Sequence, residues 1–223
     1  INPFAGWGRL AANCSAHMTE HLFNAVLVVV LPIITSSLGL SLAQAGALAS
    51  ARTLFAGVAS FPSGFFADLA SRRNILLGTC IALIGLASLG LSAAWTFPAL
   101  MLFMALGGFG GGWFHPQSLA ILSTKYRDQK AFALGVHDSS ANLGEVIGPL
   151  TIGFLLNFLE WRTSLQIWAI PGLFIGVLYA TFGREGNLAV PRRRDYRRAV
   201  WEAVVKHKAA VSLVAVSTLR AMG

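Results

Sequence analysis

Residues 75–94 read ILLGTCIALIGLASLGLSAA, twenty residues without one charged side chain. At about 1.5 Å of rise per residue, a helix of this length spans the roughly 30 Å hydrocarbon core of a bilayer. The run is apolar on all sides rather than alternating, which favours a helix over a strand. Lipid offers the backbone no hydrogen-bond partners, so a membrane span must be a helix or part of a closed barrel. This stretch therefore predicts a transmembrane helix.

The rest of the chain repeats this pattern. Only 12% of its residues are charged and 55% are hydrophobic, whereas an average soluble protein has about 25% charged residues. The composition excludes an ordinary soluble domain and makes the lipid bilayer the solvent. The apolar runs cover residues 13–35, 44–67, 75–94, 98–122, 131–156 and 164–183, with a seventh from 209.

These runs predict an all-α membrane protein. We expect a six-helix transmembrane bundle over residues 1–183, a basic linker with an interfacial helix over 184–208, and the start of a seventh helix over 209–223. Short connections make neighbouring helices antiparallel. The chain begins at Ile1 and ends inside an apolar run, so we expect a fragment of a longer protein.

The basic residues are one-sided. All but three of the 17 lysines and arginines precede the first run or follow the second, fourth and sixth. Arg162 falls on the opposite side, and Arg52 and Arg220 lie within runs. Positive loops stay in the cytoplasm, so we predict a multi-pass protein of the cell (inner or plasma) membrane with a cytoplasmic N-terminus. The net charge of +8 therefore indicates orientation and no nucleic-acid partner.

The loop after the second run reads GFFADLASRR, residues 64–73. It resembles the loop signature of the major facilitator superfamily, although Leu69 and Ser71 replace the usual basic residue and glycine. An anion at a helix C-terminus is unfavourable without a partner. Asp68 is therefore predicted to act as a conformational latch, together with its companions in the signature, Gly64, Arg72 and Arg73.

Glycines in the fifth run resemble a second signature, that of drug:proton antiporters, from which only Ile152 departs. Gly144 and Gly148 lie one turn apart and let another helix approach closely. Pro149 removes a helical hydrogen bond and can kink the helix. The matching residues are Gly135, Gly144, Gly148, Pro149 and Gly153.

A third resemblance, to the fosmidomycin-resistance-like branch of the superfamily, covers essentially the whole chain. It rests on His17, His21, Phe114, His115, Pro116, His137, Asn142, Gly144, Trp161, Arg162 and the terminal LRAMG of residues 219–223. The resemblance implies the N-terminal bundle of a twelve-helix transporter with inverted repeats. It further implies a secondary active transporter rather than an enzyme. Such a protein moves a small organic solute or drug by alternating access, with proton coupling expected, and the missing C-terminal half completes its site.

Polar side chains inside the runs form helical stripes. A charged group at a helix centre costs about 2.5–3.5 kcal/mol on insertion scales, so these groups are functional candidates. We predict a partly hydrated cavity between the first, fourth and fifth runs for substrate and protons. Its predicted residues, with Arg220 near the midplane of the seventh run, are His17, Glu20, His21, Asn24, His115, His137, Asp138, Asn142, Glu145 and Arg220. Arg52 is interpreted as structural, paired with a carboxylate such as Glu145.

Two other functions stay open. Residues 17–21 read HMTEH, the inverted zinc-peptidase pattern, in which two histidines one turn apart bind zinc. That pattern requires a third ligand, which His115 supplies only if packing happens to bring it close, so we expect no metal ion and no cofactor. The other alternative is a membrane sensor that binds a ligand without transporting it.

Overall fold

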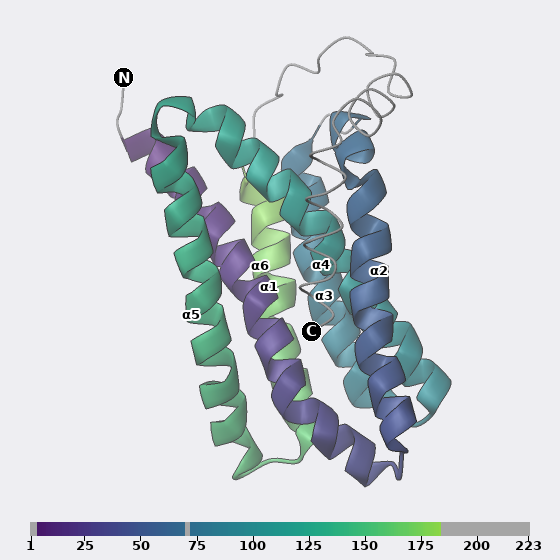
Figure 1. Cartoon of the computed structure of the whole chain (residues 1–223). Helices are drawn as coiled ribbons and strands as arrows, with labels where there is room; N and C mark the ends of the chain where they lie inside the picture. The colour runs from purple at the N-terminus through teal and green to yellow at the C-terminus, as the bar shows by residue number, and fades with distance from the viewer. Residues whose placement is uncertain (1–3, 70–71, 184–223) are drawn as a thin grey trace. The chain divides into compact units, whose positions relative to one another are not determined.

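Six long helices run through the described part of the chain (Figure 1). The structure is a computed structural model that describes residues 4–69 and 72–183, except for the side chains of residues 4–6, 61 and 64–69. The predictions for residues 184–208 and 209–223, including Arg220, lie outside the described residues. The helices are α1 (Phe4–Ser37), α2 (Leu42–Leu69), α3 (Arg73–Ala93), α4 (Phe97–Lys125), α5 (Lys130–Leu156) and α6 (Trp161–Phe182), with a short 3₁₀ turn at Arg127–Gln129.

The short connections have clear local causes. Gly39, with φ of +62°, adopts the left-handed conformation that ends α1 in a tight turn. Ser41 and Gln44 then form a reciprocal capping box, with the Ser41 amide 2.9 Å from Gln44 Oε1 and the Gln44 amide 3.2 Å from Ser41 Oγ. Such turns reverse the chain within a few residues, which produces the predicted antiparallel neighbours.

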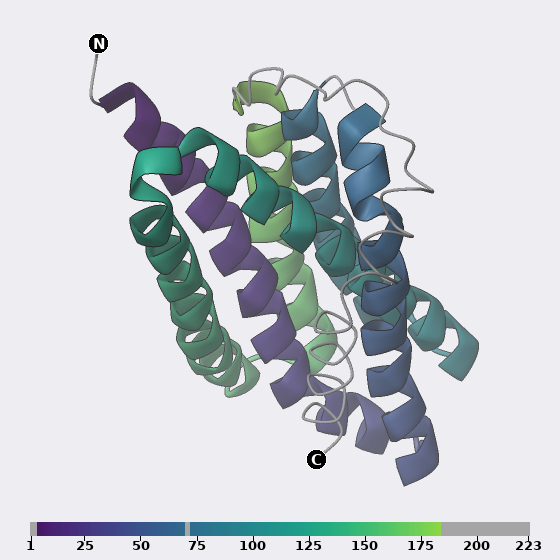
Figure 2. The same cartoon turned by 45° about the horizontal axis from the view of Figure 1, so that its top comes forward.

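The helices pack mainly in three pairs: α1 with α5, α2 with α4, and α3 with α6 (Figures 1 and 2). Small residues allow the close approach within these pairs. On α4, a Cβ added at Gly108 or Gly112 would overlap the backbone of Arg52 or Ala56 on α2. The glycine-rich stretch of α4 therefore fixes how near α2 lies.

Among the described residues, four helices are long and apolar enough to cross a membrane, namely Trp7–Ser37, Arg73–Ala93, Phe97–Lys125 and Trp161–Phe182. The other two, α2 and α5, are rich in alanine, glycine and serine and carry ionisable residues. The all-helical class is confirmed, and the six predicted runs correspond to six helices. The crossing of the membrane by α2 and α5 stays a prediction.

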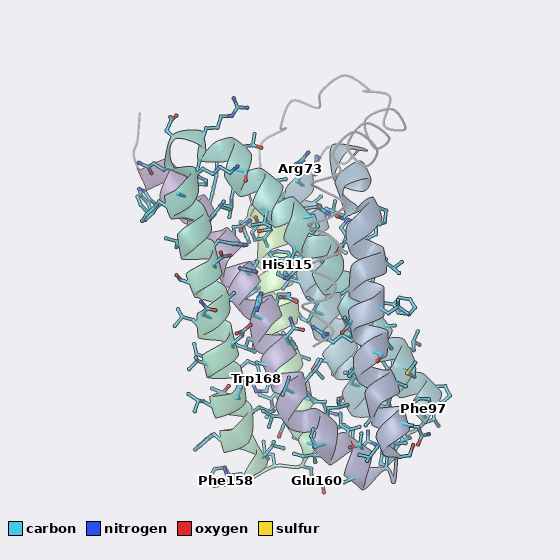
Figure 3. All side chains as sticks on the ribbon, in the orientation of Figure 1. Arg73, Phe97, His115, Phe158, Glu160 and Trp168 are labelled. Carbon is cyan, nitrogen blue, oxygen red and sulfur yellow. The ribbon has the colours of Figure 1, made fainter. Side chains whose placement is uncertain are left out.

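Arg162 connects two helices at one end of the bundle. Figure 3 places Arg73 near one end, Phe97, Phe158 and Glu160 near the other, and His115 between them. Arg162 lies at the second end, where its Nη1 donates to the carbonyls of Ser92 and Ala94 at 2.6 and 2.8 Å. Its guanidinium also lies 3.7 and 4.2 Å from the ring centroids of Trp95 and Trp161. This arginine joins the end of α3 to the start of α6.

Candidate functional site

Glu20, on α1, is the most enclosed acidic side chain of the site, with 3% of its surface exposed. Its Oε2 lies 3.1 Å from His115 Nε2 on α4 and 3.5 Å from His21 Nε2. Its Oε1 accepts a hydrogen bond of 2.6 Å from Asn24 Nδ2 and lies 4.0 Å from Arg52 Nη2 on α2. A buried carboxylate is tolerated only with such partners. Glu20 therefore ties α1 to α2 and α4.

Glycines of α4 leave the space that these side chains fill. A Cβ at Gly111 would lie 2.7 Å from Glu20 Oε1, and one at Gly107 would lie 3.0 Å from Arg52 Nη1. Both distances are shorter than ordinary contacts, so a larger residue would displace the charged group. The run GGFGGGW at residues 107–113 thus serves the site as well as the packing.

Four histidines gather beside Glu20. The ring centroid of His17 lies 4.6 Å from that of His21 and 5.1 Å from that of His115, in edge-on contacts. His137, on α5, stacks on His17 with centroids 3.7 Å apart and planes 7° apart. His17 Nδ1 lies 3.0 Å from the carbonyl oxygen of His137. Because a carbonyl only accepts, this nitrogen carries the hydrogen.

His21 connects the buried carboxylate to an exposed one. Its Nδ1 lies 2.9 Å from Oε1 of Glu145 on α5, while its Nε2 faces Glu20. The side chain of Glu145 is 55% exposed and that of His21 is 22% exposed. Exposure thus falls stepwise from Glu145 through His21 to Glu20.

A second polar chain, which the sequence reasoning missed, extends from His137 toward α6. Ser118 Oγ donates to Asn13 Oδ1 at 2.8 Å and lies 3.4 Å from His137 Nε2. Asn13 Nδ2 donates to the hydroxyl of Tyr179 at 3.4 Å. A sequence signal existed, because Asn13 lies one helical turn before His17 and continues the same polar stripe.

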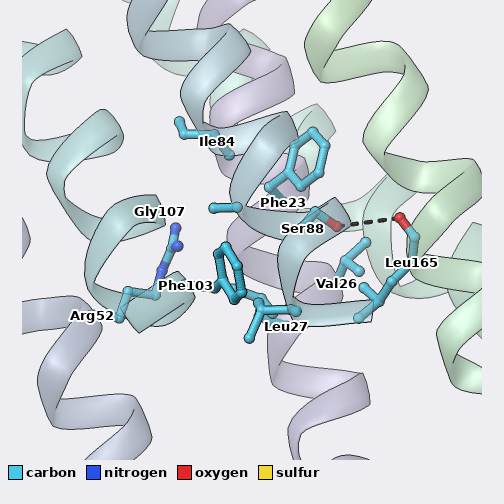
Figure 4. Close-up of a pocket in the computed structure, with 11 residues that line it drawn as sticks. Phe23, Val26, Leu27, Arg52, Ile84, Ser88, Phe103, Gly107 and Leu165 are labelled. Atoms are coloured by element: carbon cyan, nitrogen blue, oxygen red, sulfur yellow. Dashed lines mark hydrogen bonds between the residues drawn. The ribbon is translucent and has the colours of Figure 1, made fainter. Parts of the chain in front are cut away.

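Arg52 lies between the polar cluster and a small apolar cavity (Figure 4). Its Nη2 donates to Asn24 Oδ1, and Figure 4 shows its side chain beside Gly107. The cavity has a volume of about 10 Å³, enough for no more than about one water molecule. Arg52 pairs with a carboxylate, as predicted, but the suggested partner Glu145 is wrong: α2 packs on α4, whereas α5 packs on α1, so Arg52 meets Glu20 instead.

The structure brings most of the predicted residues together. The cluster contains His17, Glu20, His21, Asn24, His115, His137 and Glu145. Asp138 and Asn142 are exposed on α5 and lie outside this cluster. In the loop signature, Asp68 lies in the last turn of α2, Arg72 is exposed and Arg73 is buried, whereas the side chains of residues 64–69 lie outside the description.

The glycine-proline signature divides into two groups. A Cβ at Gly144 would lie 2.9 Å from the amide nitrogen of Leu22 and would overlap the carbonyl oxygen of Met18, both on α1. A Cβ at Gly148 would lie 2.8 Å from the Leu22 carbonyl oxygen. In contrast, no atom lies within 4 Å of a Cβ placed at Gly135 or Gly153. Pro149 lies inside α5. The middle glycines therefore set the distance between α1 and α5.

The histidine cluster also has the composition of a metal site. One ring nitrogen from each of His17, His21 and His115 lies within 4.8 Å of the others. The third ligand that the HMTEH pattern requires is thus present, supplied by the packing of α4 against α1.

Comparison with known proteins identifies the family. Residues 14–222 match the family model described as Major Facilitator Superfamily. The chain is similar to the probable hexose phosphate transport protein of Chlamydia muridarum (strain MoPn / Nigg), 25% identical over 166 residues, which are 74% of this chain and 34% of that protein. It is also similar to the fosmidomycin resistance protein of Escherichia coli (strain K12), 24% identical over 151 residues, which are 67% of this chain and 37% of that protein.

The fold has known counterparts as well. A bacterial homolog to the human lysosomal transporter Spinster, in an inward-facing and occupied conformation, superimposes with a TM-score of 0.70 at 18% identity, over 88% of this chain and 48% of that chain. The chain spans about a third of the length of the two curated relatives named above. Relatives and fold are those of transporters rather than enzymes, and they confirm the predicted family. This multi-pass membrane chain belongs to the Major Facilitator Superfamily of transporters.

Proposed function

We propose that this chain is the N-terminal half of a secondary active transporter that moves a small organic solute or drug, coupled to protons. The observation that carries the proposal is Glu20, a carboxylate 3% exposed inside a membrane bundle and in contact with two histidines. Ionisable groups at such positions are costly and mark ion or substrate pathways. A matching C-terminal bundle fits the fact that the chain spans only about a third of these relatives.

The chemistry of the cluster suits proton exchange. Histidine changes charge between about pH 5 and 8, and His21 holds one carboxylate at each ring nitrogen, Glu145 at 2.9 Å and Glu20 at 3.5 Å. A proton taken up at exposed Glu145 can pass through this ring to Glu20 and be shared with His115, 3.1 Å away. Arg52 balances the Glu20 charge when the proton is absent.

Binding of that proton changes the charge of the bundle and so the relative free energies of its two conformations. Transport then proceeds by rocking of this bundle against a second one around a central site. His17, Asn24, His115, Asn142 and Arg220 are proposed to contact the substrate on this side. Asp68 is proposed as the latch that stabilises one conformation, together with the other residues of its signature, Gly64 and the basic Arg72 and Arg73.

The choice of solutes to test is guided by the names of two relatives, a probable hexose phosphate transport protein and a fosmidomycin resistance protein. We therefore propose hexose phosphates and fosmidomycin as the first two solutes to test. The N-terminus is proposed to be cytoplasmic. The support is the position of six basic residues. Arg9 lies in the first two turns of α1, Arg72 and Arg73 lie where α2 ends and α3 begins, and Lys125, Arg127 and Lys130 lie where α4 ends and α5 begins.

The test compares Glu20→Gln with Asp138→Asn, a matched neutralisation on the exposed side of α5. The full-length proteins are reconstituted into vesicles, and a pH gradient is imposed while uptake of radiolabelled fosmidomycin and glucose 6-phosphate is followed. Glu20→Gln is expected to abolish gradient-driven movement but to keep exchange of labelled for unlabelled solute at equal pH. Asp138→Asn is expected to keep both.

Full gradient-driven transport in both Glu20→Gln and Glu145→Gln would disprove proton coupling through these carboxylates. Ligand binding without any exchange would instead support a membrane sensor. For the latch, Asp68→Asn is expected to slow exchange more than it weakens solute binding, and the reverse result would exclude that role.

A further inference from the structure

We propose that His17, His21, His115 and Glu20 form a binding site for one transition-metal ion, with zinc as the best-fitting ion. The site lies between α1 and α4, and its ring nitrogens are within 4.8 Å of one another. Three imidazoles and one carboxylate are a ligand set that four-coordinate zinc accepts. The proposal concerns binding alone and does not depend on proton-coupled transport.

The hydrogen bonds around the rings leave the correct nitrogens for the ion. His17 directs Nδ1 to the carbonyl oxygen of His137 at 3.0 Å, and His21 directs Nδ1 to Glu145 Oε1 at 2.9 Å. In a neutral imidazole the hydrogen sits on one nitrogen, so Nε2 of both rings keeps its lone pair. Metal-binding histidines are usually held in this way, with the other nitrogen on a carbonyl or carboxylate oxygen.

The remaining two ligands, His115 and Glu20, lie next to each other. Oε2 of Glu20 lies 3.1 Å from His115 Nε2 and 3.5 Å from His21 Nε2. The second oxygen of Glu20, Oε1, is held at 2.6 Å by Asn24 Nδ2. An ion bound between Nε2 of the three rings and Oε2 of Glu20 would replace the direct contact between Glu20 and His115.

The three ring nitrogens need only a modest contraction to bind one ion. Zinc–nitrogen bonds of about 2.1 Å in a tetrahedron place the ligand nitrogens about 3.4 Å apart. The present nitrogens, up to 4.8 Å apart, therefore need to close by up to about 1.4 Å. Rotation of His115, which is 36% exposed and at the open side of the cluster, supplies such a movement. That exposure, with 22% for His21, also gives the ion a way in.

A further buried group supports the assignment. The ring of His137 is fully buried and stacks on His17 at 3.7 Å, and its Nδ1 has no hydrogen-bond partner. This stacked ring fixes the plane of His17. His17 and His21 are also one helical turn apart, the spacing at which two histidines on one helix share a zinc ion.

The test measures metal binding by the full-length protein in detergent at pH 7.5, after treatment with a chelator. Zn²⁺ is titrated alone against a colorimetric indicator, and Co²⁺ is titrated while the visible absorption spectrum is recorded. One ion per chain is expected, with the visible absorption bands of tetrahedral Co²⁺. His17→Ala, His21→Ala and His115→Ala are each expected to lose at least about tenfold in affinity, since even outer-shell partners are worth about 10–100-fold.

His207→Ala, which removes the fifth histidine of the chain and lies outside the described residues, is the matched control and is expected to keep full affinity. Unchanged affinity in all three cluster variants, or equal losses in the control, would overturn the proposal. The Co²⁺ spectrum of the unaltered protein decides the matter even if a variant fails to fold. An octahedral spectrum, or a thiolate charge-transfer band from Cys14 or Cys80, would rule out this ligand set.

Discussion

Gly144 gives the most direct test of how helix packing supports the site. Replacement by alanine places a Cβ 2.9 Å from the Leu22 amide nitrogen and in overlap with the Met18 carbonyl oxygen. Both neighbours are backbone atoms of α1, which cannot turn aside as a side chain would. The two helices must therefore separate by on the order of 1 Å, since protein interiors are close-packed.

The expected cost follows from two opposing effects. Glycine to alanine inside a helix gains about 1 kcal/mol in helix propensity, whereas overpacking of a tight contact costs about 1–3 kcal/mol. Because the clash is with backbone, we place the cost at the upper end, which leaves Gly144→Ala less stable by about 1–2 kcal/mol. For a chain of this size that corresponds to a fall in the thermal midpoint of about 2–8 °C.

The assay uses the protein's own cysteines. Cys14 and Cys80 are free, buried and the only two in the chain, so a thiol-reactive fluorophore reports unfolding as the temperature rises. Gly135→Ala and Gly153→Ala are matched controls on the same helix, where an added Cβ meets no atom within 4 Å. They are expected to keep or raise the midpoint. If Gly144→Ala is as stable as these controls, then α1 and α5 do not meet as described.

The separation has a second expected effect. The hydrogen bond of 2.9 Å between His21 Nδ1 and Glu145 Oε1 joins the same two helices. A separation of about 1 Å would move these two atoms beyond hydrogen-bonding distance. Gly144→Ala is therefore expected to reduce gradient-driven transport as well as stability, whereas the two controls keep both.

Three further substitutions test the charged groups. Arg52→Met leaves the buried Glu20 carboxylate without its cation, which is expected to cost about 3–5 kcal/mol in the same thermal assay. Addition of Glu20→Gln should recover most of that loss, and a single variant as stable as the double would contradict the pairing. Gly111→Ala places a Cβ 2.7 Å from Glu20 Oε1. It should impair gradient-driven transport and lower the thermal midpoint less than Gly144→Ala does. Normal transport would show that the position of this carboxylate is unimportant. Arg162→Lys keeps the charge but loses the planar guanidinium that contacts two carbonyls and two tryptophan rings. The free energy of unfolding should fall by about 1–3 kcal/mol, and an unchanged thermal midpoint would mean that this junction contributes no stability.

The sequence predicted the helices well because a segment that crosses a bilayer must be both apolar and helical. Their ends were less well placed: α1 begins at Phe4 rather than near Asn13, since helix can continue beyond the hydrocarbon core. The same stripes of polar residues also predicted that the histidines of α1, α4 and α5 lie near one another, because each stripe shares one face and one depth.

Partners across helices were harder to predict. Arg52 was expected beside a carboxylate such as Glu145, yet it meets Glu20. The pairing of α2 with α4 and of α1 with α5 depends on glycines, and no single stretch of sequence shows which helix each glycine contacts. Likewise, Asp138 shares a helical stripe with Glu145, yet only Glu145 joins the histidine cluster. The approach of His115 to His17 and His21 depended on the same packing.

The placement of Arg52 has an electrical consequence. When Glu20 is ionised, the two side chains sum to zero, but a proton on Glu20 leaves the arginine as an uncompensated positive charge inside the bundle. A membrane voltage of 100 mV does up to about 2.3 kcal/mol of work on one such charge. The bundle with a proton on Glu20 should therefore respond to the membrane voltage, whereas the bundle with ionised Glu20 should not. Currents measured on a solid-supported membrane would record this difference.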